Sequence, residues 1–137
     1  MLDTIRKLDY FAIQSPDKPG EGARLLAALK SHGVNLLAVS GFPSGRKSQV
    51  DLVPEDAAAL RAAAKKMKLA LGASKICFVI QGDDRVGALT ETLQKLADAK
   101  INVTAIQAVT AGMGRYGAIF WVKPRDAGKA AKALGVS

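Results

Sequence analysis

The chain has 137 residues, a length that permits one ordinary domain or two small ones. Apolar residues make up 49% of it and charged residues 23%, and no apolar run is long enough for a membrane-spanning helix. Charged residues close to Met1 interrupt any signal-peptide pattern, so we expect a soluble protein of the cytoplasm with no membrane partner. The single cysteine, Cys77, excludes an intrachain disulfide and a cysteine-rich metal site.

Positive charge is in excess, with a net charge of +8. Residues 1–70 hold 11 basic and 7 acidic side chains, and residues 71–137 hold 9 and 5, so there is no basic tail. The excess collects in the second helical stretch of each half, for example at Lys65 and Lys132. We interpret these clusters as solvated helix faces; the alternative is a surface for an acidic partner or for nucleic acid.

Hydrophobic runs and turn residues predict five elements in the first half. A short apolar run ends at Ser15-Pro16, and the turn Asp17-Lys18-Pro19-Gly20 opens a helical pattern that His32-Gly33 closes. A hairpin follows, and Pro54-Glu55-Asp56 starts an alanine-rich helix. The expected ranges are a strand at 8–14, a helix after residue 20, strands at 34–42 and 48–53, and a helix from 54 to about 66.

The second half repeats this order, which indicates an internal duplication. A shift of 67 aligns the strand, the turn and the helix, and carries Gly20 onto Gly87. Further on, the shift is 70, as Pro54 and Pro124 show, and we place the three additional residues in the intervening loop. The expected ranges are strands at 75–81, 101–110 and 116–123, and helices at 86–99 and 126–134.

Each half therefore has the order β-α-β-β-α, and a fourth strand would complete the ferredoxin-like β-α-β-β-α-β motif. Only residues 68–71 and 135–137 remain to supply it, so this strand must be short or absent. We predict an α+β fold of two ferredoxin-like repeats that form antiparallel sheets with helices on one face. The predicted domains are residues 1–70 and 71–137.

The strand at 116–122 is apolar at both parities instead of alternating, so both of its faces should be covered. Helices can cover only one face of such a sheet. The other face must meet the second copy, another subunit or a ligand, and on this ground we predict a homodimer.

No set of catalytic residues emerges from the sequence. The stretch from Gly112 to Gly117 matches the dinucleotide pattern G-x-G-x-x-G, but strands flank it on both sides, so a phosphate would meet no helix N-terminus there. The sole histidine, His32, ends a helix, and no nucleophile or metal-ligand set surrounds it. We predict no enzymatic activity, no cofactor and no metal site.

An aspartate, a glycine and an asparagine recur at the same spacing in both halves. Free main-chain N–H groups at a helix start favour a carboxylate, and aspartate and asparagine oxygens accept hydrogen bonds from an ammonium group. If the turn and the next strand face one crevice, a small zwitterion would satisfy both halves. Alternatively, the aspartates cap helices and the asparagines bridge the helix end to the strand. The residues are Asp17, Gly20 and Asn35, and then Asp84, Gly87 and Asn102.

The turn Asp17-Lys18-Pro19-Gly20, the apolar helix, and Gly33-Val34-Asn35-Leu36 resemble the ACT domain, a small β-α-β-β-α-β module that senses amino acids. The second half matches less tightly: Asp84-Arg85-Val86-Gly87 lacks the proline, and Lys100-Ile101-Asn102-Val103 lacks the glycine. The resemblance covers nearly the whole chain, as two tandem ACT domains without an attached catalytic domain.

This resemblance implies that a free amino acid binds at an interface between ACT domains. It also implies edge-to-edge pairing of sheets and a stand-alone regulatory, allosteric protein whose ligand state is read by a partner such as a metabolic enzyme. The rival interpretations are a nucleic-acid-binding module on the same fold and a purely structural dimer; nucleic acid is not the expected partner because few aromatic residues are available to stack on bases. The implied ligand-binding residues are Asp17, Lys18, Pro19, Gly20, Asn35, Leu36, Asp84, Arg85, Val86, Gly87, Asn102 and Val103.

Overall fold

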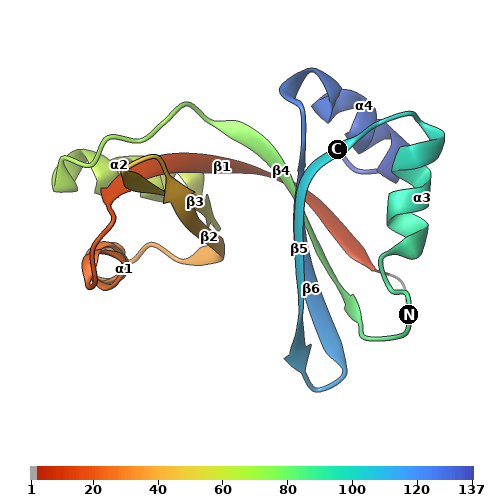
Figure 1. The fold of residues 1–137 in the computed structure, drawn as a ribbon, viewed down its shortest axis with the longest axis horizontal. Coiled ribbons are helices and arrows are strands. Elements are labelled where there is room, and N and C mark those ends of the chain that lie inside the picture. The colour runs from red at the N-terminus through yellow and green to blue at the C-terminus, as the bar shows by residue number, and fades with distance from the viewer. Residues whose placement is uncertain (1–2) are drawn as a thin grey trace. The chain divides into compact units, whose positions relative to one another are not determined.

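The computed structural model describes residues 3–137, so Met1 and Leu2 of the expected first domain lie outside the described residues. It is an α+β fold with antiparallel strands. Contacts divide the chain into two compact units, whose elements are labelled in Figure 1. One unit is Asp9–Lys75, and the other joins Ile76–Ser137 to residues 3–8. The contacts thus group residues 3–8 with the second half of the chain, whereas the repeat divides it at residue 70.

The unit Asp9–Lys75 has three strands and two helices. Its core lies between the sheet and the helices and includes Phe11, Leu29, Leu52 and Leu60, each at most 2% exposed. The strand order is β2-β3-β1, and both neighbouring pairs are antiparallel. The elements are β1 (Thr4–Pro16, of which the later part belongs here), α1 (Glu21–Ser31), β2 (Leu36–Ser44), β3 (Lys47–Pro54) and α2 (Ala57–Met67).

The second unit repeats this plan. Phe78 and Phe120 stack with their ring centroids 5.0 Å apart and form the centre of its core, and Leu96 and Ala130 pack against them from two helices. The strand order is β1-β4-β6-β5. The elements are β4 (Lys75–Asp83), α3 (Thr90–Asp98), β5 (Val103–Gly112), β6 (Arg115–Val122), the short 3-10 helix η1 (Pro124–Asp126) and α4 (Ala127–Leu134).

The fourth strand of each repeat is absent from the segments expected to supply it, because neither 68–71 nor 135–137 forms a strand. In the first unit, a single main-chain hydrogen bond from Gly72 N to Ala12 O, 2.9 Å long, marks its place beside β1. In the second unit the beginning of β1 fills that place beside β4, and Ile5 packs against the core. The strand at the start of the chain therefore begins earlier than predicted, at Thr4 instead of Leu8.

The repeat offset of 70 arises differently from the prediction of a single loop insertion. Leu52 pairs with Phe11 and Phe120 pairs with Phe78, so the offset between the two strands is 68. The first additional residue is a bulge in β5 between Thr110 and Gly112. The other two residues lie after β6, where η1 precedes α4.

Burial in β6 confirms the prediction that both of its faces are covered. Phe120 and Val122 belong to the helix-facing core, and Ile119 and Trp121, of the opposite parity, are also buried. A smaller difference concerns α3, which begins at Thr90 and not at residue 86, because a turn occupies the preceding residues.

Candidate functional site

The predicted turn of the first unit lies between the end of β1 and the start of α1. Gly20 adopts a φ of +91°, a left-handed conformation that glycine takes without strain. The Ser48 hydroxyl, at the start of β3, donates a 3.1 Å hydrogen bond to Asp17 Oδ1. Asp17, Lys18, Pro19 and Gly20 thus lie at one end of the unit, which we call the loop end.

Asn35 and Leu36 lie at the opposite end. Asn35 Nδ2 donates to Glu55 Oε2 at 2.6 Å, its carbonyl oxygen accepts from Glu55 N at 2.9 Å, and Leu36 pairs with Pro54 at the far end of β3. The 11 residues of α1 separate the two groups by about 16 Å along the helix. The expectation that the turn and the strand start share one crevice within a repeat is therefore wrong. The alternative interpretation is not met as stated either, because Asn35 joins its loop to Glu55, in the loop before α2, and no side chain of the described residues caps α1.

The second unit has the same arrangement. Its turn lies at the loop end, where Asp84 N donates to Gly114 O at 2.8 Å and Gly87 has a φ of +69°. Asn102 and Val103 lie at the other end, since Val103 pairs with Val122. Val86 is fully exposed, and it is not among the residues that line the hollow of its unit.

Arg85, a predicted ligand-binding residue, is engaged within the protein. Its guanidinium donates to the Asp3 carboxylate at 3.1 and 3.3 Å and to the carbonyl oxygens of Asp83 and Ala88 at 2.9 and 3.4 Å. Arg85 therefore ties the turn to the N-terminal segment of β1. The hydrogen bond from Arg85 lowers the pKa of Asp3, and the same bond raises the pKa of Arg85.

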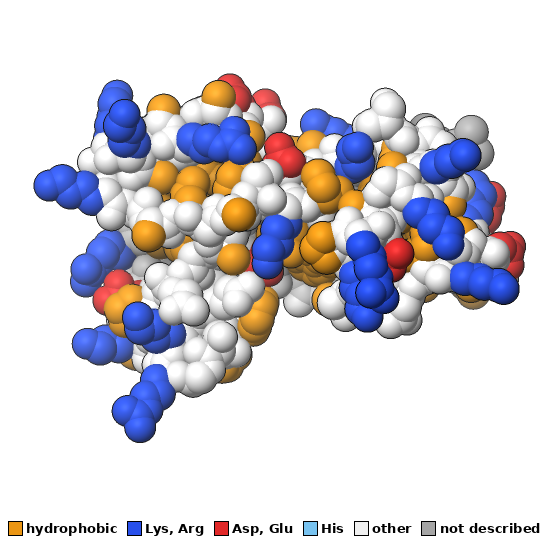
Figure 2. All heavy atoms as spheres, turned by 90° about the horizontal axis from the view of Figure 1, so that it is seen from above, with side chains coloured by type: hydrophobic (Ala, Val, Ile, Leu, Met, Phe, Trp, Pro, Cys, Tyr) orange, Lys and Arg blue, Asp and Glu red, His pale blue; other side chains and the backbone are white. Residues whose placement is uncertain are grey.

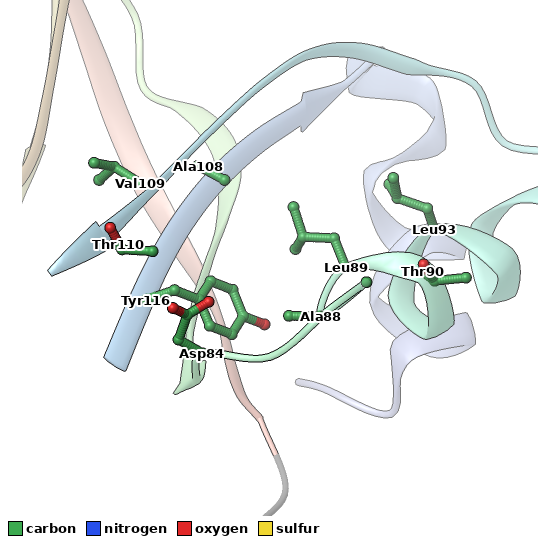
Figure 3. A pocket seen from close by; sticks show the side chains of 10 residues that line it. Asp84, Ala88, Leu89, Thr90, Leu93, Ala108, Val109, Thr110 and Tyr116 are labelled. Atoms are coloured by element: carbon green, nitrogen blue, oxygen red, sulfur yellow. The ribbon is translucent and has the colours of Figure 1, made fainter. Parts of the chain in front are cut away.

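Tyr116, at the start of β6, lies beside this ion pair and is 5% exposed. Burial, together with the nearby Asp3 carboxylate, raises the pKa of Tyr116 to about 12, because both disfavour the phenolate. Its ring faces the turn that carries Asp84 and Ala88 (Figure 3). The phenol is therefore held neutral at the wall of a hollow.

Each unit has a hollow at its loop end, and the two are related by the repeat. The first hollow has a volume of about 310 Å³, and the second, about 360 Å³. A shift of 67 carries several lining positions of one onto the other. The first hollow is lined by Asp17, Lys18, Glu21, Gly41, Phe42 and Pro43, among others. The second is lined by Asp84, Leu89, Thr90, Leu93, Ala108 and Tyr116, among others (Figure 3).

The helices that begin at these hollows lack side-chain caps. Within residues 3–137, no side chain accepts a hydrogen bond from the first turn of α1 or α3. Asp56, by contrast, caps α2 by accepting from Ala58 N and Ala59 N. Glu21 N and Thr90 N donate to the carbonyl oxygens of Lys18 and Gly87, at 3.3 and 3.0 Å. The N–H groups that follow them in the first turns of α1 and α3 are therefore the ones that a carboxylate from outside the chain could accept from.

Sequence reasoning missed the lining residues from β2 and β5, of which Gly41 and Ala108 are equivalent members. The signal was available, because in a β-α-β unit the helix carries the chain back to the other end of the sheet. The end of the second strand, and not its start, therefore returns to the first turn.

The described residues offer little for other chemistry. In residues 3–137, no group of three or more histidine, cysteine, aspartate or glutamate side chains could hold a metal ion. No helix in the same range has the length and apolar character needed to cross a membrane.

Comparison with known proteins shows relatives in fold only. No family model matches the sequence, and a search of curated proteins found no match. Among solved structures, protein BT0572 from Bacteroides thetaiotaomicron is 16% identical with a TM-score of 0.77, over 97% of this chain and 92% of that one. The ligand-free regulatory subunit of aspartate kinase from Thermus thermophilus is 15% identical with a TM-score of 0.65, over 98% and 96%.

A third structure, aspartate kinase from Clostridium acetobutylicum, described as an allosteric enzyme, is 18% identical with a TM-score of 0.54. The likeness covers 97% of this chain but 33% of that enzyme. These likenesses support the ACT-like fold that the sequence motifs suggested, and the chain therefore shares its fold with a regulatory subunit of aspartate kinase.

Proposed function

We propose that this protein is a non-enzymatic regulatory protein that binds a free amino acid at the loop end of its units. The observation that carries the proposal is the pair of hollows at equivalent positions, each beside a helix start that no described side chain caps. On this proposal, the predicted halves 1–70 and 71–137 contribute one turn each. The fold shared with the regulatory subunit from Thermus thermophilus is consistent with such a role.

The hollows contain groups that complement a zwitterion. The open N–H groups of α1 and α3 suit the ligand's carboxylate, and the carboxylates of Asp17 and Asp84 suit its ammonium group. Asp17 already accepts one hydrogen bond from Ser48, but a carboxylate has about four lone-pair sites and can accept more. Asn35 and Asn102 lie at the opposite ends of their own units, so neither contributes to the hollow of the unit that carries it.

The exposed edge strand β5 supports the predicted homodimer. All ten of its residues are uncharged and none is proline. Natural edge strands, by contrast, are normally protected from pairing by charged residues or proline. Ile106 is 38% exposed and Val109 is 71% exposed. Pairing of β5 with a second copy would satisfy the main-chain groups of this edge and bring partner side chains next to Ile106 and Val109. The buried residues of β6 no longer require a dimer, since they are covered within a single chain.

Ligand binding would be read by a partner, such as a metabolic enzyme, through a change in association or domain packing, which needs a difference in affinity between two states. Nucleic acid is not favoured as that partner. Lysine and arginine side chains are scattered over the visible face and do not form one patch (Figure 2). In addition, β3 carries no aromatic residue for base stacking.

A thermal-shift screen of the twenty amino acids tests the proposal. A ligand at a hundred times its dissociation constant should stabilise the protein by about 2.7 kcal/mol. Asp17→Asn and Asp84→Asn should reduce this stabilisation. Asn102→Ala, at the opposite end of the second unit, is the control and should leave it unchanged. No stabilisation by any amino acid, together with steeply salt-dependent binding of RNA or DNA, would contradict the proposal.

A further inference from the structure

We infer that the second hollow selects an amino acid with an aliphatic side chain, and this inference rests on the proposed function. It deepens that proposal because it assigns a ligand class to one of the two sites. The evidence is the chemistry of the side chains that line the hollow, together with the hydrogen bonds that hold Arg85, the residue after Asp84, to other groups.

Apolar side chains from two elements face each other across the second hollow. Leu89 and Leu93 come from the start of α3, and Ala108 comes from β5 (Figure 3). Ala108 pairs with Ala118 of β6, which lies on the face that carries the helices, so its methyl group faces the same side as α3. These three residues form the apolar part of the lining, which we call the apolar wall, and Asp84 adds a carboxylate to the same hollow.

Polar groups at the second hollow suit the ligand's main chain more than a charged side chain. Thr90 and Thr110 offer uncharged hydroxyl groups, whereas the hydroxyl oxygen of Tyr116 is buried. Asp84 is the only charged residue among the described residues that line the hollow. The ammonium group of the ligand would pair with the carboxylate of Asp84. An acidic ligand side chain would then find no cation, because Arg85 next to it is bound to Asp3 and to two carbonyl oxygens.

The first hollow provides the contrast. At the position equivalent to Ala88 it has Glu21, and at the position equivalent to Leu89 it has Gly22. Lys18 also lines it, so charges of both signs are present. The apolar wall is therefore a property of the second hollow alone, and the two hollows should not share a ligand preference.

Isothermal titration with L-leucine, L-alanine, L-aspartate and L-lysine tests the inference on the full chain. A pocket that buries additional methylene groups discriminates by roughly tenfold or more, so L-leucine should bind at least about tenfold more tightly than L-alanine. Ala108→Asp should weaken L-leucine binding by about tenfold or more, because it places a carboxylate in the apolar wall. The matched control is Ala105→Asp, because Ala105 is exposed, lies on the same strand β5 and does not line the hollow; it should leave L-leucine binding unchanged.

Ala108 is exposed, and an unchanged melting temperature of unliganded Ala108→Asp would show that the variant is folded. The milder Ala108→Ser should weaken L-leucine binding less than the aspartate does. Binding of L-aspartate or L-lysine as tight as that of L-leucine, or equal weakening of L-leucine binding in Ala105→Asp and Ala108→Asp, would overturn the inference and leave the proposed function standing. If none of the twenty amino acids binds, both fail.

Discussion

Gly82 tests the position of the N-terminal segment most directly. A Cβ built at Gly82 would collide with the Asp3 carboxylate and lie 2.9 Å from Cε1 of the buried Tyr116 ring. Gly117, on the neighbouring strand, is the matched control, because its Cβ would meet only Ile80 O at an ordinary 3.8 Å. The substitutions Gly82→Ala and Gly117→Ala therefore add the same methyl group to crowded and to open space.

The free energy of unfolding should respond in opposite directions. Gly→Ala in a strand stabilises by about 0.5 to 1 kcal/mol when the methyl group fits. At Gly82, overpacking costs about 1 to 3 kcal/mol, and the Asp3 carboxylate must also move away from Arg85. We expect a net loss of about 1 to 2 kcal/mol for Gly82→Ala and a gain of about 0.5 kcal/mol for Gly117→Ala.

Urea unfolding measures both values. The only tryptophan, Trp121, lies in the same unit and reports its unfolding by fluorescence. The double variant Asp3→Ala/Gly82→Ala should recover part of the loss, since one of the two colliding groups is gone. If Gly82→Ala is as stable as Gly117→Ala, residues 3–8 do not lie along β4. The conclusion that the beginning of β1 fills the place of the fourth strand in the second unit would then be refuted.

Three further predictions follow from the same structure. Asp56→Ala should lower the free energy of unfolding by about 1 kcal/mol, because the side chain caps α2. The equivalent substitution Asp126→Ala should cost less, because Asp126 makes no such hydrogen bond. Equal losses in urea unfolding would contradict this prediction. Tyr116 binds its proton more tightly when folded, so its stabilising effect is complete below pH 10 and decreases as the pH rises from 10 to about 12. Urea midpoints across this range should fall in the natural protein and less in Tyr116→Phe. Asn35→Ala should lower the unfolding free energy by about 0.5 to 1.5 kcal/mol through loss of the bond to Glu55, without changing ligand affinity; an abolished thermal shift would instead place Asn35 in the site.

Local patterns in the sequence predicted most of the fold. The duplication and the turn residues indicated two β-α-β-β-α repeats, and Gly20 and Gly87 indeed adopt the positive φ that such turns require. These features are local, because turn geometry and hydrophobic periodicity depend on residues that are neighbours in the chain. The same reasoning could not show that residues 3–8 belong with the second repeat.

The sequence by itself determined the two repeats, the fold class and the two turns at the helix starts. Only the tertiary structure decided that the turn and the asparagine of each repeat lie at opposite ends of a unit, and that Asp3 reaches Arg85 across 82 residues of chain. It also showed that Gly41 and Ala108 line the hollows. The physical reason is that strand pairing joins residues distant in the chain, and its register depends on burial of whole faces rather than on any local motif.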